Sequence, residues 1–259
     1  MPANAHYARR HDAADGTGLS ASRFLPSLGK PMSSNSIDDF LRLLKKSPSG
    51  AVFNPWWEVD EQNDVGRNAP ALRRNQLRVY LQKRVGKANV AVIGEAVGYR
   101  GGHFSGIPMT SERLLLGRSK RFHLKPRDFF SDAKPRRTSK PEKCSDGFSE
   151  PTATIVWGTL LRLGLKPDQF VLWNAFPWHS FDSHRSLLSN RMPNKSEQAA
   201  GLPVLKAFLE LFPCDQVVAL GKIAAAQLEE LNVNAHCVRH PASGGATLFR
   251  TQIAKILPS

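Results

Sequence analysis

The sequence contains only three cysteines in 259 residues, and no two of them are close together. Cys144, Cys214 and Cys237 form no Cys-x-x-Cys pair. This spacing excludes a disulfide framework, and it argues against a structural zinc site or an iron–sulfur cluster, which normally takes four ligands. We therefore expect no bound metal, and a reducing compartment, the cytoplasm, as the location of the protein.

Long apolar runs and nucleotide-binding glycine patterns are also missing. No stretch approaches the roughly 18 consecutive apolar residues of a membrane-spanning helix. The first 16 residues, MPANAHYARRHDAADG, contain no apolar stretch after their basic residues and so do not form a secretory signal. Neither a Walker pattern nor the dinucleotide Gly-x-Gly-x-x-Gly is present, which disfavours nucleoside triphosphate or NAD chemistry. We expect neither membrane insertion nor export.

Acidic residues are few compared with basic ones. The chain has 36 Lys and Arg against 22 Asp and Glu, a net charge of +14, and a pI near 10.1. Such a balance indicates a polyanionic partner, although a merely soluble basic protein is the alternative. The charge is densest in a basic loop at about 118–145, where three phenylalanines are interleaved with the cations. This mixture suits phosphate contacts and base stacking, and the alternative is a solvated loop. The phenylalanines are Phe122, Phe129 and Phe130.

Hydrophobic patterning divides the chain into a flexible tail, 1–35, and a single domain, 36–259. Four apolar runs predict buried strands, and the segments between them have helical spacing and helix-start signals. Strands that alternate with helices predict a three-layer α/β/α fold around a central, mostly parallel four-stranded sheet. The predicted strands are 90–93, 170–173, 216–220 and 235–239. The predicted helices start at Ser36, Pro70, Pro151, Asn194 and Lys222.

Unusual polar and glycine-rich stretches follow three of the predicted strands. In an open parallel sheet, ligands bind beyond the carboxyl ends of the strands, so 94–110, 174–179 and 240–245 should border one crevice. Asn174 offers both a donor and acceptors, as reading a pyrimidine edge requires, although a turn-forming Asn is the alternative. His240 alone is as compatible with a structural histidine.

These stretches resemble known motifs in order and spacing. Gly94-Glu95-Ala96-Val97-Gly98, Asn174 after an apolar strand, and His240-Pro241-Ala242-Ser243 are similar to the motifs of the uracil-DNA glycosylase superfamily. The resemblance covers about residues 88–250. It implies a central parallel sheet flanked by helices, and removal of uracil from DNA without a metal or diffusible cofactor.

The resemblance also implies roles for individual residues. His240 would donate a hydrogen bond to the developing oxyanion of the base, and Asn174 would read the uracil edge. The first motif, including Gly94, Ala96 and Gly98, would hold the sugar and the attacking water. Met109 lies where a base-stacking aromatic is expected. Residues expected to contact DNA are Lys222, Ser243 and Gly244.

Three departures from the family pattern affect these expectations. Ala96 occupies the position of a water-activating Asp in the best-known branch, and the Glu-Ala pair matches an iron–sulfur-bearing branch whose four cysteines are lacking. Glu95, the nearest carboxylate, is expected to order the water or stabilise the cationic sugar, and a salt bridge or cap is the alternative. Met109 replaces an aromatic side chain. The backups for Glu95 are Glu112, His179 and Asp182.

The third departure is the missing apolar wedge after His240. Leu248 or Phe249 would have to fill the gap left by a flipped base, and without either, single strands should be the better substrate. We therefore expect a monomeric, monofunctional glycosylase of base-excision repair that acts on uracil in single- or double-stranded DNA and leaves an abasic site. The alternatives are a non-catalytic binder of damaged or single-stranded DNA and a glycosylase for deaminated purines.

Overall fold

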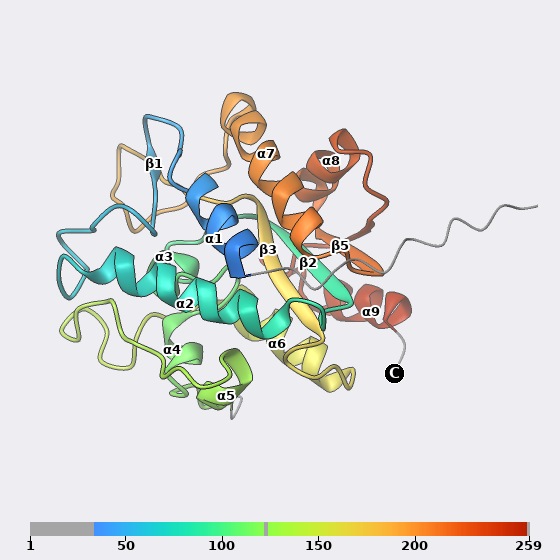
Figure 1. Ribbon diagram of the computed structural model, residues 1–259, viewed down its shortest axis with the longest axis horizontal. Coiled ribbons are helices and arrows are strands. Elements are labelled where there is room, and N and C mark those ends of the chain that lie inside the picture. The colour runs from blue at the N-terminus through green and yellow to red at the C-terminus, as the bar shows by residue number, and fades with distance from the viewer. Residues whose placement is uncertain (1–33, 122–123, 258–259) are drawn as a thin grey trace, which may run out of the picture. The chain divides into compact units, whose positions relative to one another are not determined.

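The computed structural model describes residues 34–121 and 124–257, with side chains from Ile37 onward. Its centre is a four-stranded parallel sheet in the order β3-β2-β5-β6 (Figure 1). The seven residues of β3 and the first five of β2 are buried, as apolar runs covered on both faces should be. The predicted parallel sheet is confirmed. The strands are β2 (Val90–Ala96), β3 (Phe170–Phe176), β5 (Gln216–Leu220) and β6 (His236–Val238).

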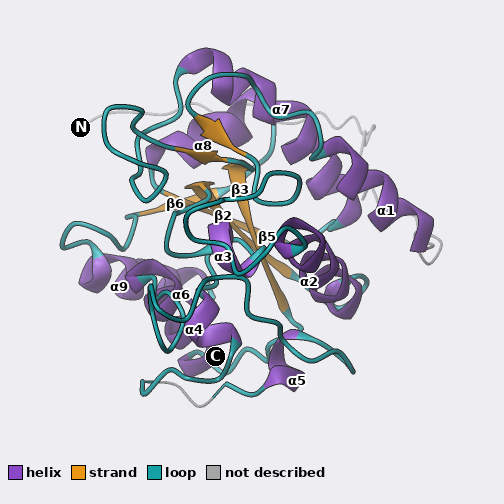
Figure 2. Ribbon diagram, turned by 90° about the vertical axis from the view of Figure 1, so that its left-hand side faces the viewer, coloured by secondary structure: helices purple, strands orange, loops and turns teal. Residues whose placement is uncertain are grey.

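Helices cover both faces of this sheet and so form the predicted three layers. Figure 2 shows α7 (Lys195–Leu211) and α8 (Lys222–Glu230) on one side of the strands, with α6 (Pro151–Arg162) and α9 (Ala246–Ile256) on the other. The helix starts follow the sequence signals. Pro151 is at the first position of α6, and Asn194 and Glu197 form a capping box before α7.

Aromatic side chains fix one helical layer to the sheet. Trp173 on β3 stacks on Phe208 of α7, with ring centroids 5.0 Å apart and planes within 10°. On the other face, Trp157 of α6 meets Phe170 edge-on at 4.9 Å. These large buried rings pack both faces of β3 against helices, which helps to fix the position of the residues at its carboxyl end.

The remaining elements lie before the sheet or in its connections. α1 begins two residues before the predicted Ser36, which therefore lies inside the helix and not at its N-cap, and the predicted tail lies otherwise outside the described residues. None of the described helices is both long and apolar enough to cross a bilayer. The elements are α1 (Ser34–Leu43), β1 (Val52–Phe53), α2 (Ala69–Arg84), α3 (Gly102–Ser105), α4 (Glu112–Leu115), α5 (Pro126–Phe129) and β4 (His179–Ser180).

The basic loop at about 118–145 is more structural than its composition indicates. Phe129 and Phe130 are fully buried in the core, so the expectation that they stack on bases is wrong; Phe122 lies outside the described residues. Arg137 donates to the carbonyls of Ser139 and Cys144, and Lys140 donates to the carbonyl of Glu61. Part of the positive charge in this loop therefore stabilises the protein itself.

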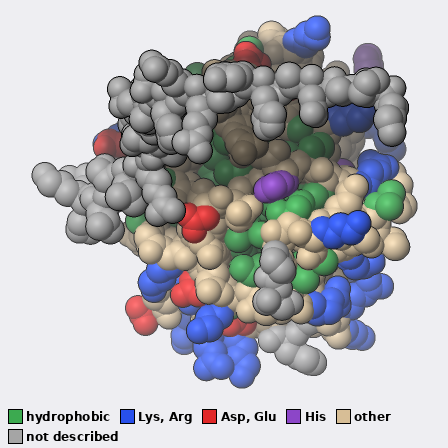
Figure 3. Space-filling view, turned by 90° about the vertical axis from the view of Figure 1, so that its right-hand side faces the viewer, with side chains coloured by type: hydrophobic (Ala, Val, Ile, Leu, Met, Phe, Trp, Pro, Cys, Tyr) green, Lys and Arg blue, Asp and Glu red, His purple; other side chains and the backbone are tan. Residues whose placement is uncertain are grey.

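Positive charge is also spread beyond this loop. On the face seen from the right of Figure 1, Lys and Arg side chains gather along the lower and right-hand edges, around a middle strip that is largely hydrophobic (Figure 3). The net charge of +14 therefore does not by itself locate a binding site. The location of the site has to come from the cavities and their side chains.

Candidate functional site

Asn174 and His240 line the same cavity, although 65 residues of chain separate them. The cavity has a volume of about 210 Å³ and lies beyond the carboxyl ends of the strands. A parallel sheet brings these ends to one edge, which is why residues far apart in sequence meet there. The other predicted residues that line this cavity are Gly94, Glu95, Ala96, Gly98 and Met109.

The amide of Asn174 is packed tightly at the base of this cavity. The residue is 1% exposed, and a Cβ on Gly94 would lie 2.5 Å from the nearer terminal atom of its amide and 3.1 Å from the sulfur of Met109. In the amide orientation that satisfies both ends, Oδ1 accepts from the Val97 N–H at 3.2 Å and Nδ2 donates to the Trp173 carbonyl at 3.3 Å. One N–H and one lone pair of Asn174 stay available to a ligand.

His240 follows the edge strand β6 and is held in one tautomer. Its Nδ1 accepts a hydrogen bond from the backbone N–H of Ala242 at 3.1 Å. A neutral imidazole with an accepting Nδ1 carries its proton on Nε2. Burial, and secondarily the charge of Arg239, lowers the pKa of His240 and so favours this neutral form. The ring therefore presents Nε2–H as a hydrogen-bond donor.

Glu95 lies at the end of β2 and lines the cavity. Burial raises the pKa of its carboxyl group above the ordinary range. Within residues 37–121 and 124–257, no side chain forms a hydrogen bond or ion pair with it. The alternative reading of Glu95 as a salt-bridge residue therefore has no partner in this part of the chain. Ala96 beside it contributes no acid–base group.

The three predicted DNA-contacting residues lie around this cavity and not in its wall. Lys222 is exposed at the start of α8, next to Gly221, whose Cβ position would lie 3.4 Å from His240. Ser243 lines a second hollow of about 300 Å³. Ser243 and Gly244 both have positive φ, +51° and +77°, so the turn after His240 bends sharply.

The three backup residues for Glu95, two carboxylates and one histidine, do not line the cavity. Glu112 is fully buried and accepts from the backbone of Thr138 and Ser139 and from the Ser139 hydroxyl. Its oxygens therefore hold the 138–139 backbone in place. Asp182 accepts from the backbone N–H of His184. These contacts are structural, so neither residue is a substitute for Glu95.

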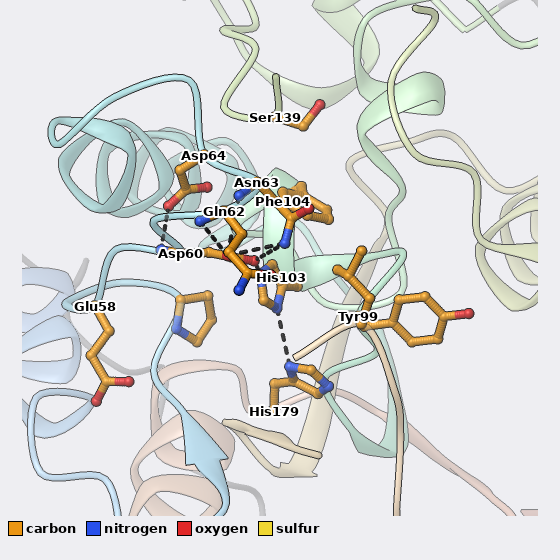
Figure 4. Close-up of polar contacts among 12 residues, drawn as sticks. Glu58, Asp60, Gln62, Asn63, Asp64, Tyr99, His103, Phe104, Ser139 and His179 are labelled. Carbon is orange, nitrogen blue, oxygen red and sulfur yellow. Dashed lines mark hydrogen bonds and ion pairs between the residues drawn. The ribbon is translucent and has the colours of Figure 1, made fainter. Parts of the chain in front are cut away.

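His179 belongs to a buried polar network beneath the site (Figure 4). Its Nε2 donates to the Ser189 carbonyl at 2.7 Å, and its Nδ1 lies 3.0 Å from Nδ1 of His103, which reaches Asp60 at 3.1 Å. Burial lowers the pKa of His179 to about 3. Both ring nitrogens are thus engaged, and His179 is not free to act on a ligand.

The two wedge candidates differ completely in exposure. Leu248, on the first turn of α9, is 57% exposed, whereas Phe249 is fully buried in the core. Consecutive residues on a helix point in different directions, so only one of the pair can face solvent here. The expectation for Phe249 is wrong, and Leu248 is the one exposed candidate of the two.

Several residues of the cavity are not among those predicted from the sequence. Glu150, Ser180, Asn190 and Arg191 all line it. Arg191 is paired with Glu197, so its charge is already balanced. Glu150 has no such partner for its Oε2. The signal that was available for Glu150 is its place directly before the helix-starting Pro151, which puts its carboxylate at a helix N-terminus.

Metal binding is not supported by the part of the chain that is described. Within residues 34–121 and 124–257 no group of three or more His, Cys, Asp or Glu side chains is arranged to hold a metal ion. We assign no residue to a metal.

Comparisons with known proteins agree with this fold. A family model described as the uracil DNA glycosylase superfamily matches residues 83–259. The chain is similar in structure to Pedobacter heparinus SMUG2, with a TM-score of 0.55 and 13% sequence identity, covering 85% of this chain and 96% of that one. No match was found among curated proteins. Because the family match spans well over half of the sequence, including the Gly94–Gly98 motif, Asn174 and His240, the chain belongs to the uracil-DNA glycosylase superfamily.

Proposed function

We propose that this chain is a monofunctional DNA glycosylase that hydrolyses the N-glycosidic bond of uracil in DNA and leaves an abasic site. The observation that carries the proposal is the shared cavity of Asn174 and His240. Its volume of about 210 Å³ is below the roughly 300–1,000 Å³ typical of pockets for drug-sized ligands, which supports a single flipped base as the occupant.

The proposed chemistry separates two charges. As the bond between C1′ and N1 breaks, the electron pair moves to the base, and positive charge develops on the sugar. The Nε2–H of His240 would stabilise the oxyanion of the leaving uracil, as a fixed donor in a partly buried site does. The free N–H and lone pair of Asn174 would read the donor and acceptor edge of the base. Met109, 5% exposed, would pack on the base through its polarisable sulfur.

Residues around the cavity would hold the DNA. Lys222, Ser243 and the backbone of Gly244 would contact phosphates beside the flipped nucleotide; Lys222 is exposed, and Ser243 lines the hollow that adjoins the base cavity. Leu248 would enter the gap in the stack. A separate basic hollow, lined by Arg113, Arg118, Lys120 and Arg121, is a candidate for a neighbouring phosphate group. All three cysteines are free, which supports a reducing cytoplasm as the location of the protein. We also propose that the protein is a monomer.

The test is release of uracil from oligonucleotides. Single- and double-stranded substrates with one uracil, and thymine-containing controls, are incubated with the protein and then treated with alkali, which cuts at abasic sites. We expect scission of the uracil strands only. His240→Ala and Asn174→Ala should each slow release at least roughly tenfold, about 1.4 kcal/mol of barrier.

Two results would contradict the proposal. Wild-type rates in both variants would remove His240 and Asn174 from the mechanism. Tight DNA binding without scission would support the second candidate, a non-catalytic binder of damaged or single-stranded DNA, which Ala96 in place of a catalytic Asp favours. Scission only on strands with a deaminated purine would change the substrate and keep the reaction class.

A further inference from the structure

Glu150 lies directly against the first glycine-rich motif. It is the N-cap of α6, and its carboxylate fits under the loop that follows β2. A Cβ on Gly98 would lie 2.7 Å from its Oε1, and a Cβ on Gly101 would collide with its Oε2. The two glycines therefore make room for this carboxylate, much as Gly94 makes room for the amide of Asn174.

The carboxylate of Glu150 is buried without a partner. Of the described residues' buried side-chain polar atoms, three lack a hydrogen bond, and Glu150 Oε2 is the one carboxylate oxygen among them. Other buried acids are satisfied, because Asp64 is paired with Arg73 and Glu112 accepts from Ser139. A buried charge without a partner is unfavourable, and such groups concentrate at functional sites.

Glu150 also borders two adjoining cavities. It lines the cavity of Asn174 and His240, and it lines the adjoining 300 Å³ hollow as well. Glu150 therefore lies where the base cavity meets the hollow beside it. If a flipped base occupied the cavity, the sugar that links it to the DNA strand would lie at this junction. Ala96 carries no carboxylate, so the carboxylates that line this cavity are Glu95 at the end of β2 and Glu150 at the start of α6.

We propose that Glu150 binds the attacking water and accepts its proton. The inference rests on the proposed function. In the step, the water oxygen forms a bond to C1′ as the bond between C1′ and N1 breaks, and its electron pair leaves with the uracil. One water proton moves to the Glu150 carboxylate, while the uracil anion is held by His240 and later takes a proton from solvent. Glu95 then stabilises the positive sugar.

Titration supports this role beside the geometry. Burial raises the pKa of Glu150 to about 7, so the carboxylate form needed for proton transfer is gained as the pH rises through neutrality. The other charged or titratable groups bordering the cavity and its adjoining hollow are Glu95, Arg191 and His240, with Tyr99 and Arg100. Arg191 stays charged because Glu197 raises its pKa, and the pKa of His240 is lowered below its ordinary value.

The experiment compares Glu150→Gln with wild type in single-turnover uracil release from about pH 5.5 to 9. Gln keeps the shape of the side chain and removes the base. We expect a rate roughly 100-fold lower, and the loss of the rise around pH 7. Glu230→Gln, which removes an exposed charge at the end of α8, is the matched control and should retain the wild-type rate and profile. Binding to DNA with an abasic site should be unchanged in Glu150→Gln.

The outcomes separate this inference from the proposed function. If wild type releases uracil and Glu150→Gln keeps both its rate and its pH profile, Glu150 is not the base, while the proposed function stands. If wild type releases no uracil, both proposals fail. Glu150→Asp is a control for misfolding, because it keeps a carboxylate on a side chain that is shorter by one methylene. This variant should release uracil slowly but retain the rise in rate near neutral pH.

Discussion

Two groups of titratable side chains in this fold are satisfied to very different degrees. Beneath the site, Asp60, His103 and His179 form a chain of contacts, and Arg73 pairs with Asp64 through both of its terminal nitrogens. In the cavity, Glu95 lacks a partner in the described chain, and Glu150 Oε2 lacks one too. Full pairing indicates a structural role, and missing pairing indicates a group reserved for a ligand.

This comparison is more informative than residue type alone. His179 comes shortly after β3 and His240 shortly after β6. Both have lowered pKa values. His179 uses both ring nitrogens within the protein, whereas His240 uses only Nδ1. The free Nε2–H is what makes His240 the candidate donor.

The largest expected effect is on the free energy of unfolding, and it concerns the fully paired residues Arg73 and Asp64. Arg73→Met removes the positive partner of Asp64 in a pair whose side chains are both 0% exposed. Removing one member of a buried ion pair costs about 3–5 kcal/mol of unfolding free energy, because the other charge is left unpaired. Urea unfolding at neutral pH measures the loss. A variant as stable as wild type would show that the pairing does not hold the fold together.

The second effect tests the unpaired group through stability. The pKa of Glu150 is raised from 4.5 to about 7, so the folded state binds a proton that the unfolded state releases between these values. Wild type should therefore lose up to about 3 kcal/mol of stability as the pH rises from 4.5 to 7. Glu150→Gln should lack this loss.

Chemical unfolding of both proteins at about pH 4.5 and pH 8 measures this difference. The stability of the variant relative to wild type should increase between the two pH values. Glu230→Gln is the control, since an exposed carboxylate should leave the pH profile of wild type unchanged. A relative stability that is the same at both pH values would mean that Glu150 titrates as it does in water.

The smallest effect concerns the rim of the cavity. Leu248→Ala removes an exposed apolar side chain, so folding should be unaffected, whereas support for a gap in duplex DNA is lost. We expect uracil release from duplex to fall roughly threefold, under 1 kcal/mol, with release from single strands unchanged. Equal losses on both substrates would exclude a wedge role. Lys255→Ala, on the last turn of the same helix, serves as a distant control.

The fold was largely predictable because its signals are local. The runs that became β2, β3 and β5 start at the predicted residues, and Asn194 with Glu197 caps α7 as expected. The parallel direction of the strands also brings Asn174, on β3, and His240, after β6, to the carboxyl-end edge of the sheet. These features depend on short apolar runs, caps and the general rule for parallel sheets.

What could not be predicted depends on contacts between distant segments. Phe129 is buried against Trp157, with ring centroids 4.9 Å apart, and no feature of the basic loop reveals that contact. The burial of the Glu150 carboxylate depends on its packing against Gly98 and Gly101, about 50 residues earlier in the chain. Phe249 and Leu248 are both apolar, and only the packing of α9 distinguishes them.

The two main contacts proposed for the base are carried by backbone of unequal stiffness. Asn174 lies within β3, a strand of seven buried residues, whereas His240 follows β6, a strand of three residues of which two are exposed. Short exposed elements open at lower free energy than buried ones. Entry of the nucleotide and departure of the product should therefore proceed by movement of the turn bearing the imidazole, while the amide stays fixed as the reference point for recognition.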